Sequence, residues 1–176
     1  VISFEREISV LVARGVKGET TTWAPPHNVH ARGILSRSSV PSGLSKAIED
    51  EARRQAVTLA NALGYVGVLA LELFVLSDGT LIANEFAPRV HNSGHWTPEA
   101  CETGQFEQHM RAVAGWPLTA TRRLFDAEMI NLIGEDGNVD VSRLAPGDKL
   151  ILYGKRDARP GRKMGHIVRR LKSRTD

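Results

Sequence analysis

Cysteine, aromatic residues and long apolar runs are all scarce in this chain of 176 residues. Cys101 is the only cysteine, which excludes an internal disulfide and fits a reducing compartment. No apolar run approaches the roughly 20 residues that span a bilayer, and residues 1–6 lack the basic and apolar regions of a signal peptide. We therefore expect a globular cytoplasmic protein without membrane contact, as 41% hydrophobic and 24% charged residues also indicate.

Acidic residues are nearly missing from the end of the chain. Between Lys149 and Arg174, ten lysine and arginine residues are accompanied by Asp157 alone. Such a basic segment can bind nucleic acid or a small phosphate group. Base stacking needs aromatic side chains, and Tyr153 is the only one in this stretch. The composition therefore favours a site for one small phosphate over a nonenzymatic RNA-binding β module, and it predicts no nucleic-acid partner.

Hydrophobic periodicity predicts an α+β fold. Residues 7–13 and 20–23 have strand patterns, whereas the polar residues 36–43 include a proline and are expected to form a loop. Apolar side chains recur at three- and four-residue spacing from 44 to 63, which predicts a helix with Gly64 at its C-terminal cap.

The character of the sequence changes near residue 118. A further helix is expected before this point, at residues 105–114. Beyond it we expect only short strands, at residues 128–134, 150–153 and 166–168. We therefore predict two units: residues 1–118, with an antiparallel sheet and helices, and residues 119–176, a small β-rich C-terminal module.

An Asp-Gly pair lies between two strand-like runs, which is the strongest short-range signal for a β-hairpin. With Asp78 and Gly79 as a two-residue turn, Glu72 faces Glu85 across the hairpin, at roughly 5 Å between Cβ atoms. Two negative charges so placed repel each other. Either the side chains turn apart into solvent, or a divalent cation, a shared proton or an arginine compensates the repulsion. Carboxylate pairs suit Mg²⁺. A three-residue turn would put the two glutamates on opposite faces, so that the metal hypothesis depends on the turn.

The segment after the hairpin is dense in chemically active side chains. Residues 84–96 read Asn-Glu-Phe-Ala-Pro-Arg-Val-His-Asn-Ser-Gly-His-Trp. With the hairpin before it, this segment resembles the signature of the N5-carboxyaminoimidazole ribonucleotide synthetase family of the ATP-grasp superfamily. Three further segments resemble the same family in the expected order, namely residues 6–10, 64–68 and 159–166.

The resemblance implies the C-terminal half of an ATP-grasp fold, followed by a small β-rich domain. It also implies an ATP- and bicarbonate-dependent carboxylation of 5-aminoimidazole ribonucleotide through carboxyphosphate, a step of purine biosynthesis. Mg²⁺ or Mn²⁺ is then the metal cofactor, ATP the co-substrate and a homodimer the complete protein. The glycine-rich phosphate lid of the family does not occur in this sequence, and we expect these 176 residues to be a fragment that is inactive alone.

The resemblance assigns roles in the metal and nucleotide sites. Glu72 and Glu85 hold the metal ions in this assignment. Glu7 lies near the ribose and, with His30, contacts the nucleotide; Asn84 and Glu85 belong to the same site. An ionised carboxylate is a suitable acceptor for adjacent ribose hydroxyls, which fits the role of Glu7. Strict alternation along the strand turns Asn84 away from the face of Glu85.

The remaining roles concern anions. Arg89 offers a planar fork that matches bicarbonate or carboxyphosphate, and the resemblance makes His91 and Asn92 catalytic residues beside it. The proton of the attacking amine passes either to His91 or to released phosphate. The ribonucleotide phosphate, far from the transferred phosphoryl group, is assigned to three basic residues: Lys155, Arg162 and Lys163.

A related loop follows the metal hairpin of another purine-pathway ATP-grasp ligase, the formate-dependent glycinamide ribonucleotide transformylase. The continuation His-Asn-Ser-Gly-His-Trp at residues 91–96 favours the carboxylase over this transformylase. The nonenzymatic RNA-binding module stays the alternative from a different functional class.

Overall fold

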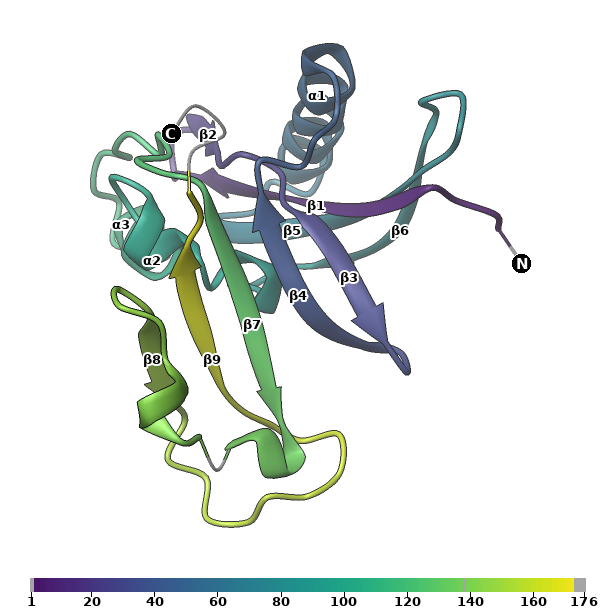
Figure 1. Ribbon diagram of the computed structural model, residues 1–176. Helices are drawn as coiled ribbons and strands as arrows, with labels where there is room; N and C mark the ends of the chain where they lie inside the picture. The colour runs from purple at the N-terminus through teal and green to yellow at the C-terminus, as the bar shows by residue number, and fades with distance from the viewer. Residues whose placement is uncertain (1, 138, 173–176) are drawn as a thin grey trace.

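The strands form one antiparallel sheet in the computed structural model, which describes residues 2–137 and 139–172 (Figure 1). Hydrogen-bonded neighbours follow the order β6-β5-β1-β3-β4-β7-β9-β8, and β2 pairs with β1. Along the chain the strands are β1 (Arg6–Arg14), β2 (Thr20–Thr22), β3 (His27–Ala31), β4 (Ile34–Val40), β5 (Gly67–Val75), β6 (Leu81–Ala87), β7 (Ala127–Ile133), β8 (Lys149–Leu152) and β9 (Lys163–Arg170). With the helices described next, the α+β prediction is confirmed.

Helix α1 (Lys46–Ala62) covers one face of β1 and β5 (Figure 1). At its start the Ser45 side chain accepts the backbone N–H of Ile48, and Gly64 follows its end with a φ of 57°. Its buried face consists of small side chains that allow a close approach to the strands: Ala52, Ala56 and Ala60. The predicted helix over residues 44–63 is confirmed. No helix in the described part of the chain has the length and apolar content to cross a bilayer.

Alternation along β1 and β5 divides their side chains between two layers. Ile8 and Val10 pack in the cluster under α1. Leu11 belongs to a second cluster on the opposite face, which also contains Trp96 and the short helix α2 (Thr97–Ala100). Helix α3 (Gln105–Val113) packs against β5 and β1 and confirms the helix predicted at residues 105–114.

Two polar residues inside the apolar runs of β1 and β5 share the second face. Ser9 of β1 and Glu72 of β5 are direct cross-strand partners, and both are nearly fully buried. Each is two residues from an apolar neighbour of the α1-distal cluster, Leu11 or Ala70, and therefore points to the same side. The sheet thus places Glu72 away from α1, on the face where the segment after the hairpin lies.

The hairpin of β5 and β6 has a longer turn than predicted. The Leu76 N–H donates to the Thr80 carbonyl at 2.9 Å, which leaves residues 77–79 as a three-residue turn. The prediction of a two-residue turn is therefore wrong. Taken alone, the longer turn shifts the register by one residue and separates the faces of Glu72 and Glu85.

A β-bulge in β6 restores the predicted pairing. Leu73 pairs with Ala83 on the turn side, whereas Glu72 pairs with Glu85 beyond it. Asn84 is the extra residue, and at such a bulge two residues oppose one on the partner strand. The facing carboxylates are therefore confirmed, but through a bulge rather than a short turn. Strict alternation does not apply to Asn84.

The loop expected at residues 36–43 is mostly strand, because β4 runs through most of it. Its serines find hydrogen-bond partners on neighbouring strands: Ser38 donates to Asn28, and Ser39 donates to Glu128. Polar side chains that are paired inside a sheet produce no hydrophobic period. The expectation of a loop is wrong for this reason.

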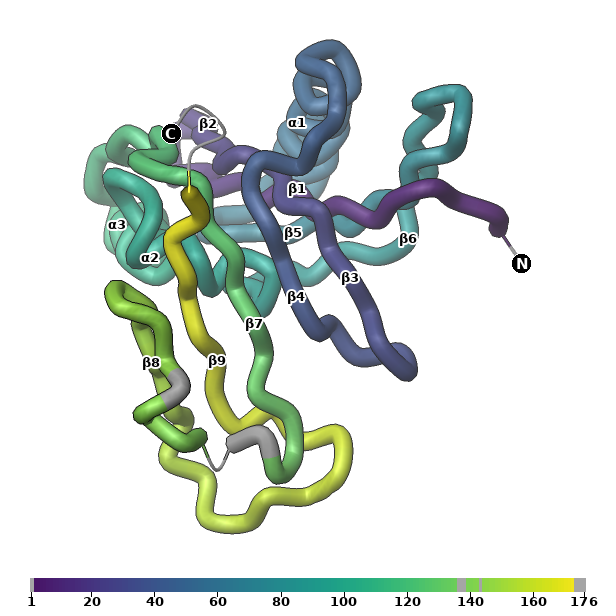
Figure 2. Tube along the Cα trace, viewed as in Figure 1, coloured from purple at the N-terminus to yellow at the C-terminus, as the bar shows by residue number. Residues whose placement is uncertain are grey.

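One sheet continues across the boundary predicted at residue 118, because β4 pairs with β7 (Figure 2). The three strands predicted beyond this boundary are confirmed as β7, β8 and β9, and β9 is longer than predicted because it begins at Lys163. The division into residues 1–118 and 119–176 stays a prediction. Residues 138 and 173–176, which include Arg174 of the basic segment, lie outside the described residues.

Candidate active site

A cleft of 480 Å³ brings most of the predicted site residues together. Strands β3 to β6, the segment after β6 and the connection between β8 and β9 all contribute to its walls. The predicted residues that line it are His30, Glu72, Glu85, Arg89, His91, Lys155 and Lys163. Glu7 lies next to it through His30, whereas Arg162 is not among the lining residues.

Glu72 and Glu85 face each other in different surroundings. Glu72 is 5% exposed, and Glu85 is exposed on the edge strand β6. The pKa of Glu72 is raised to about 7, mainly by burial and then by the negative charges of Glu85 and Glu7. A divalent cation would favour the ionised carboxylates, and an oxygen pair suits Mg²⁺. The residues present therefore fit the metal that the resemblance implies.

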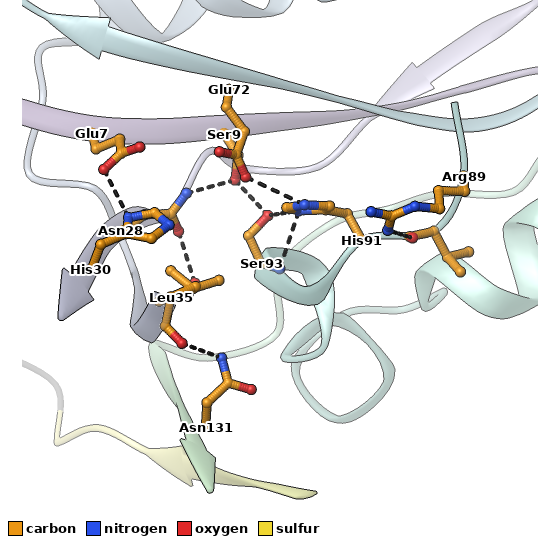
Figure 3. Close-up of polar contacts among 12 residues, drawn as sticks. Glu7, Ser9, Asn28, His30, Leu35, Glu72, Arg89, His91, Ser93 and Asn131 are labelled. Carbon is orange, nitrogen blue, oxygen red and sulfur yellow. Dashed lines mark hydrogen bonds and ion pairs between the residues drawn. The ribbon is translucent and has the colours of Figure 1, made fainter. Parts of the chain in front are cut away.

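Glu7 and His30 lie near Glu72 (Figure 3). Glu7 Oε2 is 2.8 Å from His30 Nδ1. Together with Glu72, these two residues bring possible ligand atoms within 4.8 Å of one another. Alternation along β1 puts Glu7 on the face of Ser9. The group can accept hydrogen bonds from sugar hydroxyls or contribute to a cation site.

His91 is held at the start of the short helical turn η1 (Asn92–Gly94). Its Nε2 is 3.3 Å from Glu72 Oε1 (Figure 3). Its pKa is lowered to about 4, mainly by burial and then by the charge of Arg89, so that the ring is neutral at pH 7. The buried Asn92 Nδ2 has no hydrogen-bond partner among the described residues and is an open donor.

Arg89, Lys155 and Lys163 bring three cations to one cleft. Burial lowers the pKa of Lys163, and the charge of Glu72 opposes this shift. The Lys155 Nζ donates to the Lys163 carbonyl at 2.6 Å, which ties the β8–β9 connection to the start of β9. These lysines line the same cleft as Arg89 because the connection returns over the end of the β3–β4 hairpin, where Gly161 approaches Ile34. The separation of the ribonucleotide phosphate from the transferred phosphoryl group stays a prediction.

Arg162 behaves differently from its neighbour Lys163. Its Nη1 donates to the Asp157 carbonyl at 3.1 Å, within the β8–β9 connection. Adjacent residues at the beginning of a strand point to opposite sides, which explains why only Lys163 lines the cleft. The run of basic residues in the sequence did not distinguish these two sides.

Gln105 supports the site and was not singled out from the sequence. Its Oε1 accepts the His91 backbone N–H and its Nε2 donates to the His91 carbonyl, both at 2.8 Å. Gly94 packs directly against the side chain of Leu11. A Cβ at this position would lie 2.2 Å from Leu11 Cδ2, so that a larger residue would clash. Ser9 was also missed, although a lone hydroxyl in an apolar strand is a visible signal. For Gln105, nothing in the sequence pattern marks the role.

Glu72→Gln is expected to stabilise the metal-free chain at pH 8. The folded pKa of about 7 exceeds the usual 4.5, so that the ionised carboxylate increasingly destabilises the fold as pH rises from 4.5 through 7. The neutral amide removes this cost, which is about 3 kcal/mol at most. Urea denaturation at pH 5 and pH 8 measures the difference, with the exposed Glu107→Gln as the matched control. A stability difference that does not grow between these pH values would contradict the assignment.

Sequence profiles of two families match the chain. A profile described as ATP-grasp domain matches residues 1–106. A profile described as phosphoribosylaminoimidazole carboxylase C-terminal domain matches residues 127–176. The first covers the strands that carry the carboxylates, and the second covers the strands beside the basic connection.

Individual relatives agree with these profiles. An N5-carboxyaminoimidazole ribonucleotide synthase of Brucella melitensis is 53% identical over 99% of this chain and 48% of that protein. A crystal structure of an ADP complex of N5-carboxyaminoimidazole ribonucleotide synthetase superposes with a TM-score of 0.92 at 43% identity, over 96% of this chain and 45% of that one. The Aspergillus clavatus synthase in complex with ADP and 5-aminoimidazole ribonucleotide gives 0.91 at 31% identity, over 97% and 48%.

The chain spans about half the length of these relatives. The fold class is theirs, and the facing carboxylates lie within the part that the first profile matches. With a match over more than half of its residues, the chain belongs to the ATP-grasp family.

Proposed function

We propose that the complete protein containing this chain is an N5-carboxyaminoimidazole ribonucleotide synthetase. It carboxylates 5-aminoimidazole ribonucleotide with ATP and bicarbonate, by way of carboxyphosphate. The observation that carries the proposal is the single cleft in which two facing carboxylates meet three cations and His91. Similarity to synthetases of that name over nearly the whole chain supports it.

The reaction has two transfers. A bicarbonate oxygen attacks the γ-phosphorus of ATP, the bond to the β-phosphate oxygen breaks, and ADP leaves. The carboxyl carbon of carboxyphosphate then forms a bond with the exocyclic amine, while phosphate leaves and the amine loses a proton. Glu72 and Glu85 hold Mg²⁺ or Mn²⁺, which when bound neutralises charge on the phosphate oxygens.

The cations of the cleft bind and orient the reacting anions. Arg89 can donate two parallel hydrogen bonds to bicarbonate or to carboxyphosphate. Lys163 shares the cleft with Arg89 and Glu72, and we therefore assign it to the reacting anion as well as to the ribonucleotide. We assign Asn92 to the same anion from the resemblance; its buried Nδ2 has no hydrogen-bond partner among the described residues.

The nucleotide and the ribonucleotide occupy opposite sides of this centre in our proposal. Glu7 and His30 contact the ribose of ATP, and Asn84 lies beside the metal ligands at the bulge. Lys155 and Arg162 bind the phosphate of the ribonucleotide. Lys155 lines the cleft, which supports its assignment. Arg162 lies on the same β8–β9 connection outside the cleft lining, and its assignment rests on the resemblance alone.

The alternatives are less well supported. A formate-dependent transformylase would need a different second substrate, and the three relatives described above carry the synthase or synthetase name. An RNA-binding module would present its basic residues on an open surface, whereas Lys163 is half-buried in the wall of a cleft that also contains Glu72 and Glu85. A cytoplasmic location and a homodimer of the complete protein belong to the same proposal, and sedimentation of that protein tests the dimer.

The complete protein is expected to release ADP only when both bicarbonate and 5-aminoimidazole ribonucleotide are present. A coupled ADP assay measures this dependence, and mass spectrometry with ¹³C-bicarbonate identifies the carboxylated product. Formate with glycinamide ribonucleotide serves as the control pair. Turnover with the control pair would identify the transformylase instead, and RNA binding with a steep salt dependence but no turnover would identify the RNA-binding module.

A further inference from the structure

A chain of buried hydrogen bonds leads from the middle of the sheet to His91 (Figure 3). Ser38 Oγ donates to Asn28 Oδ1 at 2.8 Å, and Asn28 Nδ2 donates to Ser9 Oγ at 3.0 Å. Ser9 Oγ then donates to Ser93 Oγ at 2.7 Å. The four polar side chains lie on β4, β3, β1 and η1, and each is at most 3% exposed. Polar groups buried in this way would destabilise the fold if they had no hydrogen-bond partners.

The chain has one direction. Ser9 accepts from the amide of Asn28 and therefore uses its single hydrogen toward Ser93. The hydroxyl hydrogen of Ser93 is then directed to His91 Nδ1, at 2.9 Å. The backbone N–H of Ser93 independently donates to the same nitrogen, at 3.4 Å. Both observations require Nδ1 of His91 to be an acceptor.

A neutral imidazole that accepts at Nδ1 carries its hydrogen at Nε2. Nε2 of His91 faces Glu72 Oε1, at 3.3 Å, in the wall of the cleft. We propose that Ser9, Asn28 and Ser93 are positioning residues that hold His91 as the Nε2–H tautomer, so that His91 acts in the cleft as a hydrogen-bond donor to an anion.

This inference deepens the proposed function and rests on it for the identity of the anion, namely bicarbonate or carboxyphosphate. The nitrogen of His91 that faces the cleft already carries a hydrogen, and the other is occupied by Ser93. The proton of the attacking amine therefore goes to another base, such as the released phosphate. Of the two acceptors that the sequence left open, His91 is the one that this geometry disfavours.

The tautomer can be read directly in the complete enzyme. Histidine-selective ¹⁵N labelling separates protonated from unprotonated ring nitrogens, and the His91 signals are identified by their loss in His91→Gln. We expect Nε2 to be protonated and Nδ1 unprotonated. Asn28→Asp keeps the side-chain shape and, when ionised, can only accept, so that Ser9 turns its hydrogen toward residue 28 and Ser93 turns toward Ser9. The backbone N–H of Ser93 is then the donor that remains at Nδ1, and we expect the fraction of His91 with a protonated Nδ1 to rise. A protonated Nδ1 in the wild type, or a fraction of protonated Nδ1 in folded Asn28→Asp equal to that of the wild type, would overturn the proposal.

A second variant serves if Asn28→Asp does not fold. Ser93→Ala removes one donor to Nδ1, and we expect kcat to fall roughly 2- to 13-fold, the range of one ordinary hydrogen bond, while the KM for ATP stays unchanged. The control is Ser39→Ala, a serine of β4 whose hydroxyl bonds to Glu128 outside this chain. A kcat in Ser93→Ala equal to that of the control would refute the positioning role. The tautomer measurement needs no turnover, so that an enzyme without carboxylase activity would refute the proposed function alone.

Discussion

Glu85→Gln in the complete enzyme is expected to lower the use of metal-ATP by at least about 100-fold in kcat/KM. The amide cannot supply the negative charge that a divalent cation needs from this position, and metal ions contribute several kcal/mol to phosphoryl transfer. Folding is expected to survive, because Glu85 is exposed and its charge repels Glu72. Steady-state kinetics with varied Mg²⁺ and ATP measures the effect, and circular dichroism checks the fold.

The matched control for this variant is Glu107→Gln. Glu107 is an exposed glutamate on α3 that pairs with Arg111 and lies outside the cleft. It should leave kcat/KM within error of the wild type. Near-normal turnover of Glu85→Gln would show that the facing carboxylates do not hold the metal.

Arg89→Ala is expected to lower kcat on the order of 100-fold, because it removes an oriented donor to the developing carboxyphosphate. Arg162→Ala should instead raise the KM for 5-aminoimidazole ribonucleotide, with little change in the KM for ATP. Losing a charged donor to a bound phosphate costs roughly 1.5–3 kcal/mol, or about 10- to 150-fold in binding. The different surroundings of the two arginines, one in the cleft wall and one bonded to the Asp157 carbonyl, motivate this contrast.

Kinetics of both variants beside Arg54→Ala decides between the two roles. Arg54 is an exposed arginine of α1 that pairs with Glu51 on the far side of the sheet and should have no effect. If Arg162→Ala raised the KM for ATP and left the KM for the ribonucleotide unchanged, the β8–β9 connection would belong to the nucleotide site. If Arg89→Ala changed only a KM, Arg89 would bind substrate without acting in the transition state.

The parts of the fold that could be predicted are those with local signals. The period of α1, its cap at Gly64 and the apolar strands β1 and β5 follow from spacing alone. The strand through residues 36–40 could not be read in this way, because its serines are stabilised by partners elsewhere in the chain. Such pairing depends on tertiary structure and leaves no period.

The residues of the candidate site also differ in whether a local pattern in the sequence could place them. Glu72, Glu85, Arg89 and His91 lie within one hairpin and its continuation, so that a motif could place them together. The joining of Lys163 to this group depends on the order of strands in the sheet, which brings β9 next to β7 and β7 next to β4. The positioning residues Ser9 and Asn28 meet only because β1 pairs with β3. No spacing along the sequence contains this information.

The bulge at Asn84 has a consequence for how related chains can drift apart. The bulge lies between the tip of the hairpin and the carboxylate pair. The pairing of Glu72 with Glu85 therefore has a different register from the pairs on the turn side of the bulge. Insertions and deletions accumulate at exposed tips such as residues 77–79. Changes of length at this tip can therefore be absorbed before they reach Glu72 and Glu85, and evolution can vary the outer hairpin while the chemistry within stays in place.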